Sequence, residues 1–339
     1  MANVLELFSQ PEILNYLGNR QYPALLGETL FPEVKRDSLE FDQIKGAGMV
    51  PVIASVHAFD TEAEIDSREG SKQAMELALI KRKRQMKEKD IIALENPRTS
   101  AEQQYLMKQV YNDVDALTAG VRARVELMRM EAASNGTVTL NENGLNLTLD
   151  YKVPANHKQV LSGSDLWSDP DSDPITQLMD WYATMGTKPK RALTSAAALA
   201  ALLRNPKVIG ALFGNNSARV ATRTDLNAFM TQLELPTIAT YEEVYKKQKA
   251  DGTYEQLRYF PQNKFVMLPA GPLGETIYGP TAEEIRLARD PQIDTSKVGN
   301  VLAMVYEDGK DPVSTWTKAV ATALPSFPAA DEVFQATVL

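Results

Sequence analysis

Few side chains in this sequence are of the types that commonly perform catalysis, and they are scattered along the chain. There are two histidines, His57 and His157, and no cysteine. The absence of cysteine excludes disulfides, thiolate nucleophiles and cysteine-ligated metal centres. A Ser-His-Asp triad would have to use one of the two histidines, and no G-x-S-x-G elbow accompanies them. Both are therefore interpreted as ordinary strand-edge or loop histidines.

Two short segments have the composition of ligand sites but lack the required spacing. Asp165, Asp169, Asp171 and Asp173 fall in SGSDLWSDPDSDP. An EF-hand loop needs a glycine at its sixth position and a glutamate at its twelfth, and this segment has neither. A solvated loop is favoured, with a weak cation site as the alternative. The glycines of GPLGETIYG (271–279) are interrupted and followed by prolines, which favours a turn over a phosphate cradle.

The most concentrated charge in the sequence is the basic run IKRKRQMKEKD, residues 80–90, in which six of eleven residues are basic. The whole chain has a formal net charge of -8 and a pI of about 5.1, which argues against general affinity for nucleic acid. The run lacks the interleaved aromatics of single-strand binders and the apolar face of a membrane-surface helix. An acidic surface on another protein is the favoured partner, and a solvated face is the alternative.

The elements that must carry these residues begin with a segment that has no core of its own. The chain has 339 residues, 44% of them hydrophobic, which predicts a folded protein of two domains or one elaborated domain. Its first residues, MANVLELFSQPEILNYL, lack a basic segment followed by an apolar one, so no secretory signal is expected. No window approaches the ~20 apolar residues that span a bilayer. Prolines and glycines divide residues 1–45 into short apolar clusters, which predicts an arm lying along something else.

Residues 46–95 are predicted to form an extended, charged excursion that does not fold alone. MVPVIASVHAF has strand character, and DTEAEIDSREGSKQ reads as solvent-facing. Helix propensity favours a helix for KQAMELALIKRKRQMKEKD, whereas the alternation of Met75, Leu77 and Leu79 equally permits a strand.

The clearest element is a long amphipathic helix that starts at a capping box, Thr99-x-x-Glu102, and stops at Gly136. Its apolar residues recur at steps of three and four, at Leu106, Val110, Val114, Leu117, Val121, Val125 and Met128. A coiled coil is possible but not preferred, because no consistent e/g charge pattern accompanies the stripe. Residues 137–153, TVTLNENGLNLTLDYKV, predict a β-hairpin.

A Ser-, Asp- and Pro-rich loop at 162–174 marks a boundary, and residues 175–294 then mix helices with strands. Short helices are predicted in ITQLMDWYATMG, after Thr194 or Ser195, after Asp225 as N-cap, and in TAEEIRLARD. Strands are predicted around Asp251-Gly252, in KFVMLPAG and in ETIYG, and again through residues 298–339.

The order of these parts resembles the major capsid proteins of tailed bacteriophages, which have the Hong Kong 97-type fold, and in detail the lambda-type major head protein family, major capsid protein E. The segments that carry the resemblance are FPEVKRDSLEFDQIKG (31–46), AEIDSREGSKQAMELALIKRKRQMKEKD (63–90), LWSDPDSDPITQLMDWY (166–182), NKFVMLPAGPLGETIYG (263–279) and the C-terminal PVSTWTKAVATALPSFPAADEVFQATVL. The resemblance covers essentially the whole chain. The acidic loop and the 240–260 hairpin depart from lambda's own protein, so only the family is implied.

The resemblance implies an α+β structural protein without catalytic, cofactor-binding or metal-binding residues. Its copies would form hexamers and pentamers of an icosahedral shell that encloses double-stranded DNA without specific binding and without a membrane. Scaffold, portal and decoration proteins are the further partners that it allows. Assembly would take place in the bacterial host cytoplasm, and the product would be the virion capsid.

The resemblance also divides the chain. Residues 1–45 would be the N-terminal arm, 46–95 the extended loop, 96–164 with 296–339 the peripheral domain, and 165–295 the axial domain. Intersubunit contacts are predicted at Lys81, Arg82, Lys83 and Arg84, which would face an acidic surface on an adjacent copy, and at Arg68 and Glu69. The alternative function is an α/β ligand-binding protein or enzyme with a pocket of convergent polar groups in residues 175–294.

Overall fold

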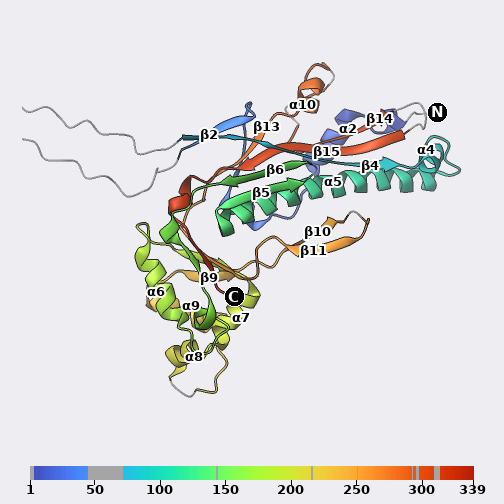
Figure 1. Ribbon diagram of the computed structural model, residues 1–339. Coiled ribbons are helices and arrows are strands. Elements are labelled where there is room, and N and C mark those ends of the chain that lie inside the picture. Colours follow the sequence, from blue (N-terminus) through green and yellow to red (C-terminus); the bar gives the residue numbers. More distant parts are fainter. Residues whose placement is uncertain are drawn as a thin grey trace, which may run out of the picture.

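The computed structural model describes residues 4–44, 72–142, 144–214, 217–249, 251–291, 293–294, 298–308 and 314–339. One long helix, α5 (Ser100–Asn135), lies along an elongated sheet, and a second unit of helices and strands sits at its C-terminal end (Figure 1). Both helices and sheets contribute to the core, so the predicted α+β class is confirmed.

The remaining helices are short and fall into an N-terminal set, one helix before α5, a set in the second unit, and a last helix beside the first sheet (Figure 1). They are α1 (Val4–Leu7), α2 (Gln10–Asn19), α3 (Leu26–Leu30), α4 (Glu88–Glu95), α6 (Pro174–Thr184), α7 (Ala196–Arg204), α8 (Pro206–Phe213), α9 (Arg223–Gln232) and α10 (Ala282–Leu287).

The strands form two five-stranded sheets and three hairpin-like pairs among the described residues. The first sheet contains β1 (Glu33–Lys35), β4 (Ala78–Met86), β13 (Thr276–Gly279), β14 (Leu302–Asp308) and β15 (Ser314–Pro325). The second has the order β7 (Lys158–Val160), β16 (Phe334–Thr337), β12 (Lys264–Leu268), β8 (Arg191–Thr194) and β9 (Thr237–Thr240). The pairs are β2 (Glu40–Ile44) with β3 (Lys72–Glu76), β5 (Thr137–Glu142) with β6 (Leu145–Asp150), and β10 (Val244–Gln248) with β11 (Tyr254–Arg258).

Helix α5 begins and ends where the sequence predicts. The Thr99 hydroxyl accepts a hydrogen bond from the Glu102 amide at 3.2 Å, although the Glu102 carboxylate accepts from the Arg98 amide and not from that of Thr99. Gly136 closes the helix at φ 68°, and a Cβ there would lie 2.7 Å from Val153. The predicted stripe is buried against β15 and β4 of the same chain, so α5 is not a coiled-coil arm.

The segment whose secondary structure the sequence left open forms two strands followed by a helix. β4 pairs with β15 in antiparallel register from Ala78 opposite Ala323 to Met86 opposite Thr315. Met75 and Leu77 are buried as the strand alternation predicts, but Leu79, the third residue of that alternation, is 56% exposed. Pairing with a strand more than two hundred positions away therefore overrides the local helix propensity of Lys, Arg and Met.

The second unit is built around an aromatic cluster. The Trp167 ring lies 5.1 Å from that of Phe265, and the Trp181 ring lies 5.2 Å from that of Phe334. Ser195 caps α7 by accepting from the Ala198 amide at 3.0 Å, which is one of the two predicted caps.

The predicted N-cap at Asp225 is wrong. Thr222 caps α9, and Asp225 is the third helical residue of a capping box, because its carboxylate reaches back to the Thr222 amide.

Three strands cross the boundaries that the resemblance implied. β7 was expected with the peripheral residues 96–164, but it pairs with β16 in the second sheet. β16 was expected with the peripheral residues 296–339, but Phe334, Ala336 and Val338 pack in the apolar cluster of the second unit. β13 was expected with residues 165–295, but it pairs with β15 and β1 in the first sheet. The two units therefore exchange strands, and the chain passes between them more than once.

Candidate assembly surfaces

The basic run lies on β4, where its side chains alternate between two faces of the first sheet. The Arg84 guanidinium forms an ion pair with Asp113 on α5, and Arg82 Nη2 lies 3.5 Å from Gln248 Oε1 on β10. On the opposite face, Lys83 Nζ lies 4.0 Å from the centroid of the Trp316 ring. The alternation follows from strand geometry, in which successive side chains point to opposite sides.

The four predicted contact residues on β4 therefore do not share one environment. Lys83 and Arg84 contact groups of their own chain, whereas Lys81 and Arg82 form no ion pair among the described residues. Arg68 and Glu69 lie outside the described residues. An intersubunit role for all six residues stays a prediction.

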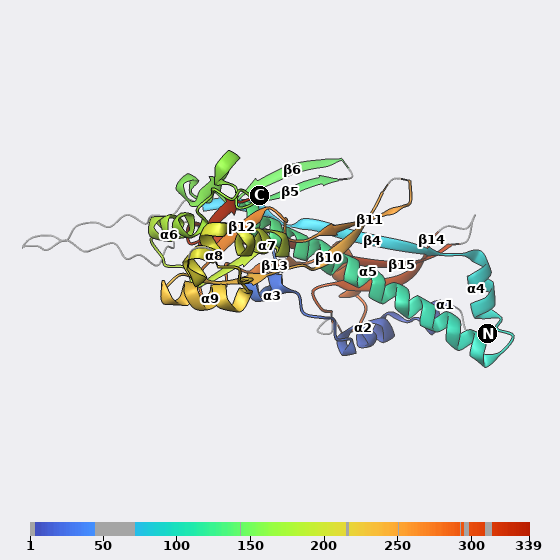
Figure 2. The ribbon, with the colours of Figure 1, turned by 90° about the horizontal axis from the view of Figure 1, so that it is seen from below.

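The N-terminal arm is held against the α5 surface by a cluster around one carboxylate. Asp115 accepts hydrogen bonds from the Tyr16 hydroxyl at 2.8 Å and the Tyr22 hydroxyl at 3.1 Å, and it pairs with Arg20 at 2.9 Å. Burial, followed by the nearby Asp115 charge, raises the pKa of Tyr22 to about 12, so its hydroxyl keeps its proton at neutral pH. Figure 2 shows α2 and α3 beside α5, as predicted for an arm that lies along another element.

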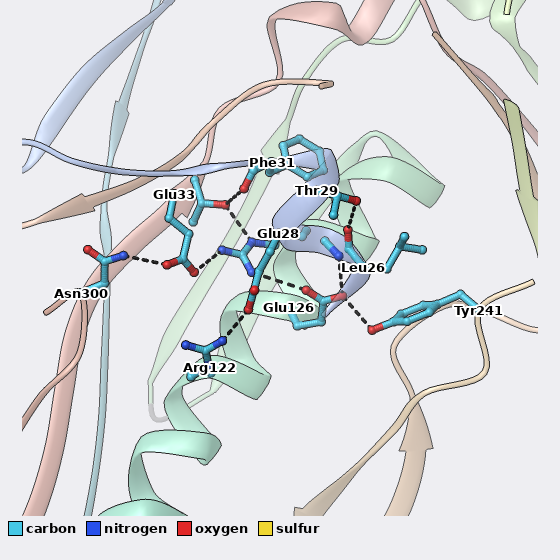
Figure 3. A network of polar contacts seen from close by, with 12 residues as sticks. Leu26, Glu28, Thr29, Phe31, Glu33, Arg122, Glu126, Tyr241 and Asn300 are labelled. Atoms are coloured by element: carbon cyan, nitrogen blue, oxygen red, sulfur yellow. Dashed lines mark hydrogen bonds and ion pairs between the residues drawn. The ribbon is translucent and has the colours of Figure 1, made fainter. Parts of the chain in front are cut away.

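A buried ionic junction ties the arm, α5 and the second unit together (Figure 3). The Glu126 side chain on α5 is 0% exposed. Its Oε1 accepts from the Gly27 amide of α3 at 2.9 Å and from the Tyr241 hydroxyl, in the segment that follows β9, at 2.8 Å. One carboxylate thus joins three regions that are far apart in the sequence.

Arg129, one helical turn further along α5, supplies the positive charge of the junction. Its guanidinium is 1% exposed and donates from Nη2 to Glu33 Oε1 at 2.7 Å and from Nε to Thr276 Oγ1 at 2.8 Å. Its Nη1 lies 3.5 Å from Glu126 Oε2. Asn300 donates to the other oxygen of Glu33 at 2.7 Å, so β1 is tied through Glu33 to both α5 and the segment that precedes β14.

The two carboxyl groups of the junction shift in opposite directions. Burial raises the pKa of Glu126, because the Gly27, Tyr241 and Arg129 contacts do not fully compensate for lost hydration. Burial also acts on Glu33, but its hydrogen bonds from Arg129, Asn300 and Tyr278 outweigh it and lower the pKa of that group. Arg129 is therefore paired mainly with Glu33, in agreement with the shorter distance.

No motif in the sequence marks Glu126, Arg129 or Glu33 as a buried cluster. The available signal was the spacing Arg122, Glu126, Arg129, which places charged residues at steps of four and three beside the apolar stripe of a buried helix. Charged residues are rarely buried unless paired, so such a set predicts buried partners.

The histidine and the aspartates considered as candidates in the sequence make packing and capping contacts where the structure describes them. His157 is buried beside Phe334. Asp173 caps α6 by accepting from the Thr176 amide at 3.2 Å, and Asp169 accepts from the Asp171 amide at 2.9 Å, so the acidic loop is organised by its own backbone. Among the residues that the structure describes, no three histidine or carboxylate side chains gather in a way that could hold a metal ion. His57 lies outside those residues.

Within the same described ranges, no single helix is long and apolar enough to cross a membrane. Helices α7 and α8 reach the required length and composition only as a pair, and that pair is bent by 66°.

An N-terminal segment laid along a long helix, the β2–β3 strand pair, one elongated sheet and a second α+β unit together define the Hong Kong 97-type fold of phage capsid proteins. The putative capsid protein of a prophage of E. coli CFT073 has this architecture at a TM-score of 0.61 and 14% identity, covering 97% of this chain and 99% of that chain. A phage-related protein of Bordetella bronchiseptica RB50 matches at 0.49 and 13%, covering 96% of each chain. The capsid of Myoviridae phage XM1 matches at 0.43 and 12%, covering 94% of each chain.

The family model for phage major capsid protein E matches residues 12–338, and the chain belongs to this family. No curated protein sequence matches the chain. Family membership makes this a structural protein of the capsid shell, located in the virion and assembled with other subunits. The resemblance inferred from the sequence is confirmed.

Proposed function

We propose that this chain is the major shell subunit, and that its copies form the hexamers and pentamers of an icosahedral head that encloses double-stranded DNA. The observation that carries the proposal is the family match across residues 12–338, whose description is that of a major capsid protein. Assembly takes place in the cytoplasm of the bacterial host. Scaffold, portal and decoration proteins are further partner classes, and the protein has no catalytic role.

The parts of the fold take separate roles in this proposal. Residues 1–45 act as the arm, 46–95 as the extended loop, α5 with the first sheet as the peripheral domain, and the second sheet with α6–α9 as the axial domain at the capsomer centre. The apolar cluster around Trp181, which contains residues of the second sheet and of α6–α9, supports the division, although the cluster around α5 also includes Leu193, Val266 and Leu268 of that sheet. With the observed pairing, β16 is counted with the axial domain and β13 with the peripheral domain.

Recombinant expression of the full chain tests the proposal. Sedimentation and negative-stain electron microscopy are expected to reveal closed shells or discrete six- and five-subunit rings, either alone or with a scaffold from the same source. A chain that stays monomeric at high concentration under both conditions refutes the proposal.

A further inference from the structure

A groove of about 1080 Å³ runs between β4, α5, β5 and β10. Its walls are four elements that are far apart in the sequence, and the β10–β11 hairpin lies on the opposite side of α5 from the first sheet (Figure 1). The buried junction around Glu126 does not line it, so the groove is a separate feature of the surface.

The strands meet the groove at their edges. Three consecutive residues of β4, Ile80, Lys81 and Arg82, line it, and so do four consecutive residues of β10, 245–248. Because successive side chains on a strand point to opposite faces, a groove touched by consecutive residues lies against the strand edge. Among the described residues β4 pairs only with β15, and β10 pairs only with β11. Each therefore presents one row of backbone groups without a neighbouring strand, which an added extended segment can pair with.

The side chains that line the groove carry an excess of positive charge. Five lining residues are basic and two are acidic: Lys81, Arg82, Arg124, Lys246 and Lys247 against Glu131 and Glu142. Both acids already have partners in the chain. Glu142 binds Lys247 at 2.8 Å and Arg124 at 3.3 Å, and Glu131 accepts from the Thr139 amide at 3.2 Å.

The partner of Arg82 in the groove is a neutral side chain. Its Nη2 lies 3.5 Å from Gln248 Oε1, the outer limit of a hydrogen bond. A carboxylate arriving beside Arg82 would form the stronger, charge-assisted bond that this guanidinium lacks.

Apolar surface lies between the charged rims. Ala123 and Leu127 of α5 and Tyr245 of β10 line the groove and are partly exposed, and Gly120 beside them has no side chain to fill it. A Cβ at Gly120 would come no nearer than 3.6 Å to any neighbour, and that neighbour is Arg82. The site thus offers strand edges, cations and an apolar floor, which suits an extended polypeptide with carboxylates and small apolar side chains.

We propose that this groove binds an extended, carboxylate-bearing segment of a second copy of the chain. The inference rests on the proposed function, because a shell brings many copies into contact. A second copy fits the charge, since each chain carries a formal net charge of -8 and therefore has an excess of carboxylates. Duplex DNA would contact the basic side chains through its phosphates, but it would not pair with the strand edges or cover the apolar surface of the groove.

Zero-length crosslinking of mixed-isotope shells tests the proposal directly. Shells assembled from equal amounts of unlabelled and ¹⁵N-labelled chains are treated with a carbodiimide, which joins lysine amines to nearby carboxylates, and are then digested for mass spectrometry. The expected result is heavy–light peptides that join Lys81, Lys246 or Lys247 to an Asp or Glu of another copy. The Lys247–Glu142 link, in which both partners belong to one chain at 2.8 Å, provides the same-isotope control.

Charge reversal tests the same groove independently. In Arg82→Glu combined with Lys246→Glu, like charges would face the incoming carboxylates, and the yield of shells is expected to fall by at least about tenfold. The matched control is Lys249→Glu, which makes the same kind of charge change beyond β10 at a residue that does not line the groove and pairs with Glu255. Its shell yield is expected to match that of the wild type, and circular dichroism checks that each variant is folded.

Three outcomes overturn the inference. The first is that the groove lysines of wild-type shells give only same-isotope crosslinks. This measurement needs no variant, so it tests the proposal even if the double variant does not fold. The second is an unchanged shell yield from a folded double variant. The third is salt-dependent binding of duplex DNA that is lost in the double variant, which would reassign the groove to nucleic acid. If the wild-type chain forms no shells at all, the proposed function fails first.

Discussion

Replacing Arg129 with methionine is expected to be among the most destabilising single changes in this protein. Methionine has a similar length and leaves the packing on α5 nearly intact, but it removes the only cation within hydrogen-bond distance of buried Glu126 among the described residues. Three contacts disappear, to Glu33 at 2.7 Å, to Thr276 at 2.8 Å and to Glu126 at 3.5 Å. Breaking a buried ion pair from one side costs about 3–5 kcal/mol, because the other charge stays buried without compensation.

The expected consequence is measurable by thermal and chemical denaturation of the full chain. At roughly 2 °C per kcal/mol, appropriate to a long chain, the variant should melt about 6–10 °C below the wild type. Glu126→Gln is the matched comparison. It keeps an oxygen that accepts from Gly27 and Tyr241 and loses only the long contact to Arg129, so its cost is expected near 1 kcal/mol.

The double variant separates the two contributions. With Glu126→Gln in place, Arg129→Met no longer leaves an unpaired buried charge on α5. The free energy lost in the double variant should therefore be smaller than the sum of the losses in the two single variants. A loss below about 1 kcal/mol for Arg129→Met alone, or a larger loss for Glu126→Gln than for Arg129→Met, would contradict the view that Arg129 neutralises this junction.

Three further predictions use the same denaturation assays. Gly27→Ala should lower the free energy of unfolding by about 1–3 kcal/mol, because its Cβ would clash with the buried Glu126 carboxylate, and the N-terminal segment should become more sensitive to proteolysis. Gly18→Ala is the control, because no atom lies within 4 Å of its Cβ, and it should be neutral or mildly stabilising. Asn205→Ala should cost about 1–2 kcal/mol, because Asn205 caps α8 and donates to Ser172 Oγ at 2.9 Å; a loss within error would contradict that role. Because the pKa of Glu126 is raised on folding, its protonated form favours the folded state, so the stability of the wild type relative to Glu126→Gln should fall as pH rises through that raised pKa; a rise over that interval would contradict the sign.

The features that the sequence predicted correctly are those whose signals are local. The Thr99 cap, the apolar stripe and Gly136 all lie within α5 itself, and Asn141 and Gly144 lie within a single hairpin. Each is fixed by neighbours a few positions away, so propensity and periodicity are sufficient to find it. The N-terminal arm was predicted from the opposite signal, a lack of any way to bury its apolar clusters locally.

The features that the sequence left open depend on contacts between distant positions. The strand form of β4 is set by its pairing with β15, and nothing within residues 78–86 excludes a helix. The junction has the same character, since Gly27 and Glu126 are 99 positions apart and Tyr241 and Glu126 are 115 apart. Reading the basic run as one surface also assumed that its side chains act together, whereas a strand divides them between two faces.

The place of β16 in the second sheet has a consequence for synthesis on the ribosome. It lies between β7 and β12, yet it follows every other strand of that sheet in the chain. A nascent polypeptide that stops before residue 334 has all the helices of the second unit but leaves β12 with an unpaired edge and the Trp181 ring without its Phe334 partner. Prematurely ended chains should therefore be poorly folded and open to host proteases, so that shells are built from chains that have been translated through β16.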